Sequence, residues 1–82
     1  GNGPACVIVA SDAEPYVRQG RNVFHGFVLA CDRWILPGEA CLILNEAGAL
    51  LGHGISQCNA NELSVFTKGI AVKTRGGILA EE

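Results

Sequence analysis

The sequence predicts a mainly β domain with two short helices, an α+β fold in the chain order β-α-β-β-β-α-β. Short runs of β-branched and aromatic residues recur along the chain, separated by glycine, proline and asparagine, as is typical of strands and turns. Two helix-capping patterns interrupt these runs. Glycines fall at the expected bends of the strands, which favours a small barrel.

The chain is expected to begin with a strand followed by a helix. Residues 6–10 are apolar and β-branched, so they predict a buried strand. Ser11 and Glu14 have the spacing of a capping box. Gly20 can adopt the left-handed conformation that often ends a helix. Residues 12–19 are therefore expected to form a helix of two turns.

The middle of the chain is expected to be extended. Residues 22–32 are rich in aromatic and β-branched residues and predict one long strand, bent or bulged at Gly26. Residues 40–45 and 49–56 predict two further strands, joined by a hairpin turn at 46–48. Two glycines within the second of these strands would weaken it or let another backbone approach closely.

The last third of the chain repeats the helix-then-strand pattern. Asn59 and Glu62 form a second capping-box pattern, and Gly69 is expected to end the short helix that follows. Residues 70–75 alternate in polarity and predict the final strand.

Length and charge limit the function classes. Eighty-two residues, 49% of them hydrophobic, suffice for one domain, expected at residues 5–78. Residues 1–4 are interpreted as linker or non-native residues and 79–82 as an acidic tail. The net charge of −2 argues against non-specific polyanion binding but leaves room for a local basic patch. No apolar run is long enough to span a membrane.

The sequence contains no recognisable catalytic or metal-binding motif. No nucleophile, base and orienting residue occur at a familiar spacing, so no catalytic residue, cofactor or metal is predicted. The cysteines lack zinc-site spacing, and neither His25 nor His53 completes such a site. Reduced thiols are expected, with a disulfide or a metal site as the alternatives. The cysteines are Cys6, Cys31, Cys41 and Cys58.

Two basic clusters are candidate binding residues. Arg18 and Arg21 flank Gly20 and could hold phosphate at the end of the first helix, although cations there would also offset the helix dipole. Lys73 and Arg75 lie two apart on the last strand and therefore share one face. Lys68 precedes that strand. The alternative for this second cluster is a solvated face of an edge strand.

Three aromatic residues have both structural and binding interpretations. Phe24 and Phe27 are three apart, so in a regular strand they would point to opposite faces, unless a bulge restores the register. Core packing is the favoured role for both, and stacking on an unpaired base is the alternative. Trp34 is expected to cover one end of the barrel, with a base-stacking platform as the alternative.

A set of short motifs accompanies the predicted element order. The motifs are Pro37-Gly38-Glu39, the hairpin return from Gly48 to Gly54, Asn61-Glu62-Leu63, Lys68-Gly69 and Ala71-Val72. Together with the element order, these motifs resemble the PUA domain family over residues 6–78. The stretch from Glu14 to Phe24, followed by Phe27-Val28, is most similar to the C-terminal domain of archaeal archaeosine tRNA-guanine transglycosylases and their paralogues.

The resemblance implies a pseudo-barrel flanked by two helices that binds structured RNA, expected to be the acceptor stem and 3′ end of tRNA. It implies a non-catalytic module in the cytoplasm that anchors tRNA for a catalytic domain in the same polypeptide. The alternatives are a protein-interaction barrel without RNA affinity and an appendage of a metabolic enzyme. The implied RNA-binding residues are Arg18, Gly20, Arg21, Asn22, Val23 and Phe24 on one side and Lys68, Gly69, Lys73 and Arg75 on the other.

The chain also departs from the family pattern. Where the family commonly has Ala-Lys, this chain has His25-Gly26, which removes one expected phosphate contact. His25 could replace that lysine in part, but only when protonated. Weaker RNA binding than in relatives is therefore expected.

Overall fold

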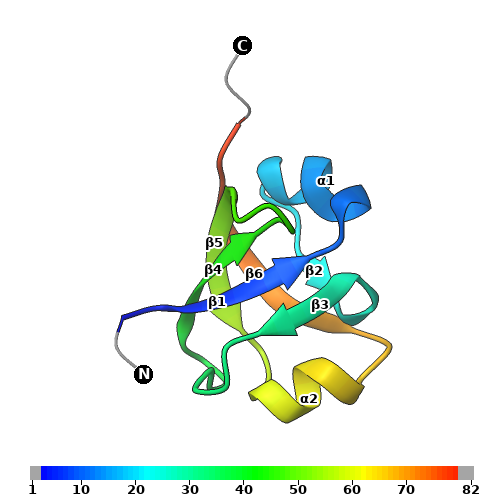
Figure 1. Cartoon of the computed structure of the whole chain (residues 1–82), viewed down its shortest axis with the longest axis vertical. Helices are drawn as coiled ribbons and strands as arrows, with labels where there is room; N and C mark the ends of the chain where they lie inside the picture. The colour runs from blue at the N-terminus through cyan, green and yellow to red at the C-terminus, as the bar shows by residue number, and fades with distance from the viewer. Residues whose placement is uncertain (1–2, 80–82) are drawn as a thin grey trace.

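Six strands form one sheet, in the order β2-β6-β5-β4-β1-β3, in the computed structural model of this protein, which describes residues 3–79 (Figure 1). The two edge strands, β2 and β3, follow one another in the chain, so the sheet curls into a nearly closed pseudo-barrel and the predicted fold class is confirmed. The strands are β1 (Ala5–Val9), β2 (Val23–Phe24), β3 (Val28–Cys31), β4 (Ala40–Leu44), β5 (Leu50–Ser56) and β6 (Ile70–Gly77).

Two helices cover opposite ends of the barrel (Figure 1). Helix α1 (Glu14–Arg18) follows a 3-10 turn, η1 (Ser11–Ala13), and buries Val17. Helix α2 (Ala60–Val65) buries Leu63. Each short helix thus contributes one fully buried aliphatic side chain to the core.

The core is built by alternation along the strands. Strand β1 buries every second residue, and it pairs in parallel with β4 and antiparallel with β3. The other pairs, β4 with β5, β5 with β6 and β2 with β6, are antiparallel. Side chains at alternate positions of β1 therefore point into the barrel. The largest buried aliphatic side chains come from the strands, from both helices and from the β3–β4 connection: Val7, Val9, Val23, Ile43, Leu51 and Val72, with Val17, Leu63 and Ile35.

Glycines let β5 and β6 approach closely. A Cβ atom at Gly54 would overlap the Lys73 carbonyl oxygen and lie 2.9 Å from Thr74 Cα, and one at Gly52 would lie 2.5 Å from the Gly76 oxygen. The close backbone approach that the glycines of this strand predicted is therefore confirmed.

The first helix differs from its prediction. The segment expected as one helix over 12–19 is a 3-10 turn followed by the five residues of α1. The predicted capping box at Ser11 and Glu14 is wrong, because neither N-cap position receives a side-chain hydrogen bond. The Glu14 carboxylate instead forms a salt bridge with Arg18, one helical turn later. Gly20 does adopt the predicted left-handed conformation, with φ at +85°.

The second capping box is confirmed, but the predicted end of its helix is wrong. Asn59 accepts a hydrogen bond from Glu62 N at 2.9 Å, and the Glu62 carboxylate accepts one from Asn59 N at 3.0 Å. The helix ends at Val65, because Phe66 is already extended. Gly69, with φ at +90°, lies in the turn before β6 and does not end the helix.

The long strand predicted over 22–32 is wrong, because it is divided into β2 and β3. The 3-10 turn η2 (His25–Phe27) separates them and carries the predicted bend at Gly26. The bend is sharp enough that β2 pairs with β6 and β3 pairs with β1. Hydrophobic content alone could not distinguish one bent strand from two strands on opposite edges.

Residues 1–2 and 80–82, which belong to the predicted linker and acidic tail, lie outside the described residues. Among residues 3–79, neither helix has the length and apolarity needed to cross a bilayer.

Candidate nucleic-acid interface

The loop from α1 to β2 is folded back on its own helix. Gly20 N donates to the Val17 carbonyl oxygen and Arg21 N to that of Tyr16, each at 2.9 Å. These bonds close the helix end because Gly20 adopts a left-handed conformation. The loop therefore presents Arg21 and Asn22, both exposed, at a fixed place beside the barrel.

This loop is bonded to strand β6. The side-chain oxygen of Asn22 accepts a hydrogen bond from Thr74 N at 3.1 Å, and Val23 pairs with Val72. A side chain at Gly77 would overlap the Arg18 carbonyl group, so the end of α1 lies directly against the end of β6. The two clusters that the sequence predicted separately are thus brought together.

Arg18 is occupied by contacts within the protein. Its guanidinium donates to Glu14 Oε1 from Nη2 at 3.1 Å and to the Ile78 carbonyl oxygen from Nη1 at 2.7 Å. Glu14 Oε2 in turn accepts a bond from Asn45 Nδ2 at 3.4 Å. Arg18 therefore links α1 to the chain after β6.

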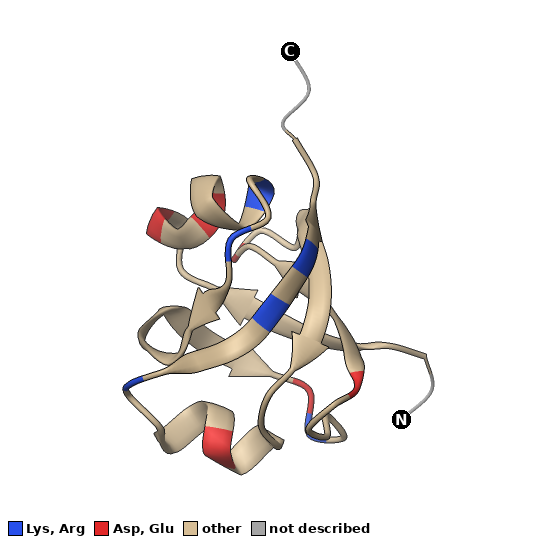
Figure 2. Ribbon diagram, turned by 180° about the vertical axis from the view of Figure 1, so that it is seen from behind, with Lys and Arg blue, Asp and Glu red and all other residues tan. Residues whose placement is uncertain are grey.

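The other four basic residues of the prediction are exposed and form no salt bridge with residues 3–79. Lys73 and Arg75 are exposed two residues apart on β6, where Figure 2 shows two blue bands along the strand. Arg21 lies in the α1–β2 loop on this side, and Lys68 lies in the turn leading into β6 (Figure 2). The carbonyl oxygen of Gly69 accepts a bond from His25 N, which ties this turn to η2.

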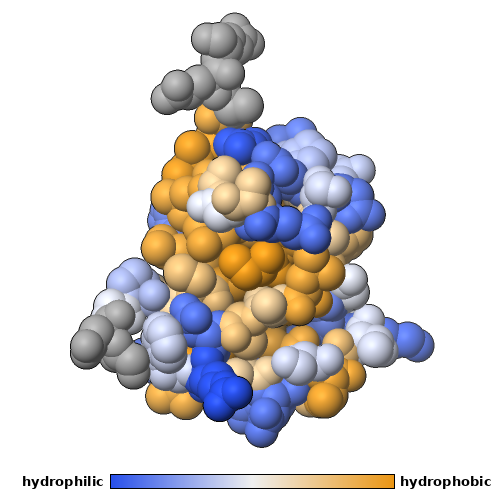
Figure 3. All heavy atoms as spheres, in the orientation of Figure 1, coloured by the Kyte–Doolittle hydropathy of each residue, from blue (hydrophilic) through white to orange (hydrophobic). Residues whose placement is uncertain are grey.

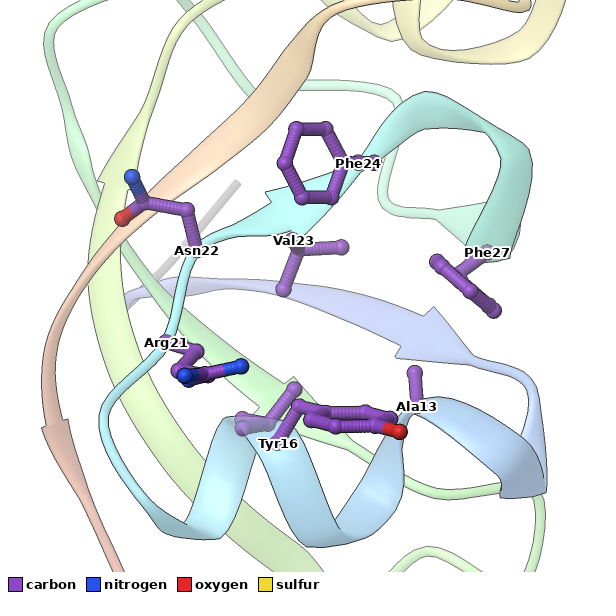
Figure 4. Close-up of a pocket in the computed structure, with 8 residues that line it drawn as sticks. Ala13, Tyr16, Arg21, Asn22, Val23, Phe24 and Phe27 are labelled. Atoms are coloured by element: carbon purple, nitrogen blue, oxygen red, sulfur yellow. The ribbon is translucent and has the colours of Figure 1, made fainter.

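An open cleft of about 300 Å³ lies between α1 and the segment 21–27 (Figure 4). Tyr16 and Phe24 are about half exposed at its rim, and the Arg21 guanidinium lies 5.9 Å from the Tyr16 ring centre. Phe27 lines the same cleft while packing partly against the core. The cleft is lined by Ala13, Tyr16, Val17, Arg21, Asn22, Val23, Phe24 and Phe27.

The aromatic residues differ from their predictions in two respects. Phe24 and Phe27 line one cleft instead of opposite faces, because η2 rather than a strand joins them. Core packing holds for Phe27 but is wrong for Phe24, which is 51% exposed. Tyr16 was not predicted as a site residue, since its position in a two-turn helix gave no sign of which way it faced. Trp34 is 43% exposed, and the neighbouring Ile35 is the side chain that is fully buried.

His25 cannot replace the missing lysine from its position in the structure. Its ring is buried, with Nε2 3.7 Å from the Cys58 sulfur and an edge-on contact to the Phe66 ring at 5.4 Å. The ring therefore belongs to the packing between η2 and α2, and the expected phosphate contact through His25 is wrong.

The four cysteines are free thiols in the structure. Burial raises the pKa of Cys41 to about 11, with a smaller contribution from the nearby Cys6 thiol. Burial also raises the pKa of Cys6, Cys31 and Cys58, helped by Asp32 for the first two and by Glu62 for the third. Within residues 3–79, no three metal-ligating side chains cluster.

Comparison with known families and sequences gives a consistent result. The profile of the PUA domain matches residues 6–78. The tRNA-guanine(15) transglycosylases of Methanocaldococcus jannaschii and Thermococcus onnurineus are 46% and 44% identical over 72 residues, which is 88% of this chain. The chain spans only 11% and 12% of the length of those two proteins.

Solved structures show the same fold. NSun6 from Pyrococcus horikoshii matches all of this chain, and 22% of its own, with a TM-score of 0.89 and 26% identity. A PUA domain protein from Thermoplasma acidophilum matches with a TM-score of 0.83 at 22% identity, covering 88% of this chain and 48% of its own. At that identity the second likeness bears on the fold alone.

Proposed function

Because this chain belongs to the PUA domain family, whose members bind RNA, we propose that it contacts the acceptor stem and 3′ end of tRNA. One observation carries the proposal. Four basic residues without salt-bridge partners among residues 3–79 lie along β6 and the loops bonded to it, next to an open aromatic cleft. Although the net charge of the chain is −2, four of its six basic residues lie on one side of the domain.

The basic residues of this face bind the phosphate backbone. The backbone positions of Arg21, Lys73 and Arg75 lie on the side of the molecule seen in Figure 2, and Lys68 lies in the turn leading into β6. Arginine suits phosphate because its planar fork donates two parallel hydrogen bonds. RNA 2′-hydroxyl groups supply the contacts that distinguish RNA from DNA.

The remaining predicted site residues position this face. Gly20 and Asn22 fix the loop, and Val23 anchors it in the core. Arg18 acts mainly by holding α1 against the chain after β6, since two partners already occupy its guanidinium.

The aromatic cleft receives an unpaired base from the 3′ end. Phe24 stacks on the base, and Tyr16 with Arg21 closes the opposite side of the cleft (Figure 4). Stacking of this kind contributes about 1–3 kcal/mol per base. The Phe24→Leu variant is expected to weaken binding of tRNA with an intact 3′ end more than binding of tRNA lacking its last nucleotides.

The relatives suggest the larger setting. We propose that the domain holds tRNA for a catalytic domain of a tRNA-guanine transglycosylase type in the same polypeptide, in the cytoplasm. The 46% identity to an archaeal enzyme of that name supports this assignment.

The decisive experiment is a titration of the domain with tRNA. The variant Lys73→Gln/Arg75→Gln should bind at least tenfold more weakly at about 0.1 M salt, and its log-log salt slope should be shallower by about 1.5, from ~0.7–0.9 per lost contact. Arg33→Gln is the control for loss of a single exposed charge outside β6, since Arg33 lies in the β3–β4 connection. Equal affinities for all three proteins would exclude β6 as the RNA-binding face.

A second candidate function is protein contact through the opposite face. Figure 3 shows broad apolar surface on the side seen in Figure 1, away from the two basic bands of β6. Leu29 on β3 and Leu50 on β5 are exposed large apolar side chains. The two functions are compatible, because a partner docked there would leave the basic face open.

A further inference from the structure

His53 stands on the outer face of β5, where its ring crosses to β6. Its side chain is exposed, and its backbone is in register with Gly76 of β6. A Cβ atom built at Gly76 would lie 2.7 Å from His53 Nε2, so the ring tip rests over that glycine. Because Gly76 has no side chain, the His53 imidazole can lie against the backbone of β6 at this position.

The position of the His53 ring on β6 belongs to the basic face, which we define by Arg21, Lys68, Lys73 and Arg75. Ile55, two residues after His53 on β5, pairs with Lys73, so both strands turn these side chains to the same outer side. The register shifts at this point, and Arg75 is the extra residue of β6 between the pair at Thr74 and the pair at Gly76. His53 therefore stands beside Arg75 and in line with Lys73.

The remaining surroundings of His53 leave its ring available. Its neighbours on β5 are Gly52 and Gly54, and its partner on β4 is Leu42, so none of these brings a charge. The thiol of Cys41 on β4 is buried in the barrel. The charged groups that face the ring are thus the cations of β6, and no hydrogen bond joins the ring to another of residues 3–79.

We propose that His53 is a further phosphate-binding residue of this face, and that the domain takes up a proton there when RNA binds. The proposal rests on the RNA-binding function proposed above. The negative charge of a bound phosphate favours the protonated imidazole. The ring takes this proton from solvent and donates it in a hydrogen bond to a phosphate oxygen.

The test is tRNA affinity at pH 7.8 and pH 5.8 for the wild type, His53→Gln and His53→Lys. Lowering the pH should strengthen wild-type binding three- to tenfold more than it strengthens binding by His53→Gln, and should steepen the wild-type salt slope by about 0.7–0.9 relative to that variant. His53→Lys carries its charge at both pH values, so it should bind more tightly than wild type at pH 7.8 without the extra pH dependence. Circular dichroism at each pH verifies that all three proteins are folded.

The outcomes separate this inference from the function on which it rests. If the wild type and His53→Gln bind tRNA with the same pH dependence, His53 is not a phosphate contact and the inference is wrong. If no folded protein binds tRNA at either pH, the RNA-binding proposal itself fails, and this inference fails with it.

Discussion

Gly54 shows how a single residue sets the spacing between two paired strands, β5 and β6. The position where its side chain would begin is filled by the backbone of β6 at Lys73 and Thr74. A methyl group at this position must push two paired strands apart, because backbone atoms cannot rotate away as a flexible side chain can.

The Gly54→Ala variant should therefore lower the free energy of unfolding by roughly 2–3 kcal/mol, as overpacking does. Urea denaturation followed by circular dichroism measures this. Gly26→Ala is the control, because a Cβ atom at Gly26 meets nothing within 4 Å and the backbone has no positive φ. A loss as large at Gly26 as at Gly54 would contradict the packing explanation.

Cys41 predicts a loss of stability in alkali. Burial raises its pKa to about 11, so above pH 9 the unfolded chain releases this proton while the folded chain keeps it. The unfolded state then binds fewer protons, and the free energy of unfolding falls as pH rises from 9 to 11, by up to about 1.4 kcal/mol per pH unit. Urea denaturation at pH 8 and pH 10 should show a smaller decline for Cys41→Ala, and an equal decline would assign the effect to other groups.

For single residues, the sequence predicted which basic side chains lie near the α1–β2 loop, but it did not predict the contacts that each of them makes. Arg18 and Arg21 were predicted as a pair, but the contacts of Arg18 depend on Glu14 and on the carbonyl group of Ile78, 60 residues away. Tyr16 could not be assigned to the cleft before the direction of α1 was known. Long-range contacts of this kind have no local sequence signal.

At the level of elements, the two capping patterns had opposite outcomes. Both matched the same motif, yet only Asn59 and Glu62 form the reciprocal bonds. At the first site the chain enters a 3-10 turn, and Glu14 is engaged by Arg18. The i,i+4 spacing of Glu14 and Arg18 allows an ion pair that competes with the capping role of Glu14, and a capping motif does not indicate which of the two forms.

This difference predicts a matched pair of stability effects. Asn59→Ala should cost about 1 kcal/mol of folding stability, because it removes the side-chain oxygen that accepts the Glu62 N–H bond at the start of α2. Ser11→Ala should cost less than about 0.3 kcal/mol, since the Ser11 side chain makes no capping bond. Chemical denaturation of both variants in the same buffer checks this, and equal losses would show that the capping bonds are not the cause.

For the whole molecule, the arrangement of charge matters more than its sum. The net charge of −2 suggested weak affinity for polyanions, but the fold places Lys68, Lys73 and Arg75 on one side with Arg21. Their clustering could be predicted only through the family resemblance, because β6 and the α1–β2 loop lie about 50 residues apart in the sequence.

The domain should therefore bind tRNA with a log-log salt slope near −3, from four phosphate contacts at ~0.7–0.9 each. Fluorescence anisotropy between 50 and 300 mM KCl measures this slope. A slope near zero would show that the basic residues do not contact phosphate.

The turn η2 affects how fast the domain folds. Because three residues join the two outermost strands of the sheet, β2 and β3 cannot both find their partners until the chain from residue 5 to residue 72 has been assembled. Such pairing between distant segments makes a chain fold slowly for its size, on a scale of milliseconds to seconds. The α1–β2 loop, which we propose contacts RNA, ends in β2 and would then be among the last parts of the domain to become ordered.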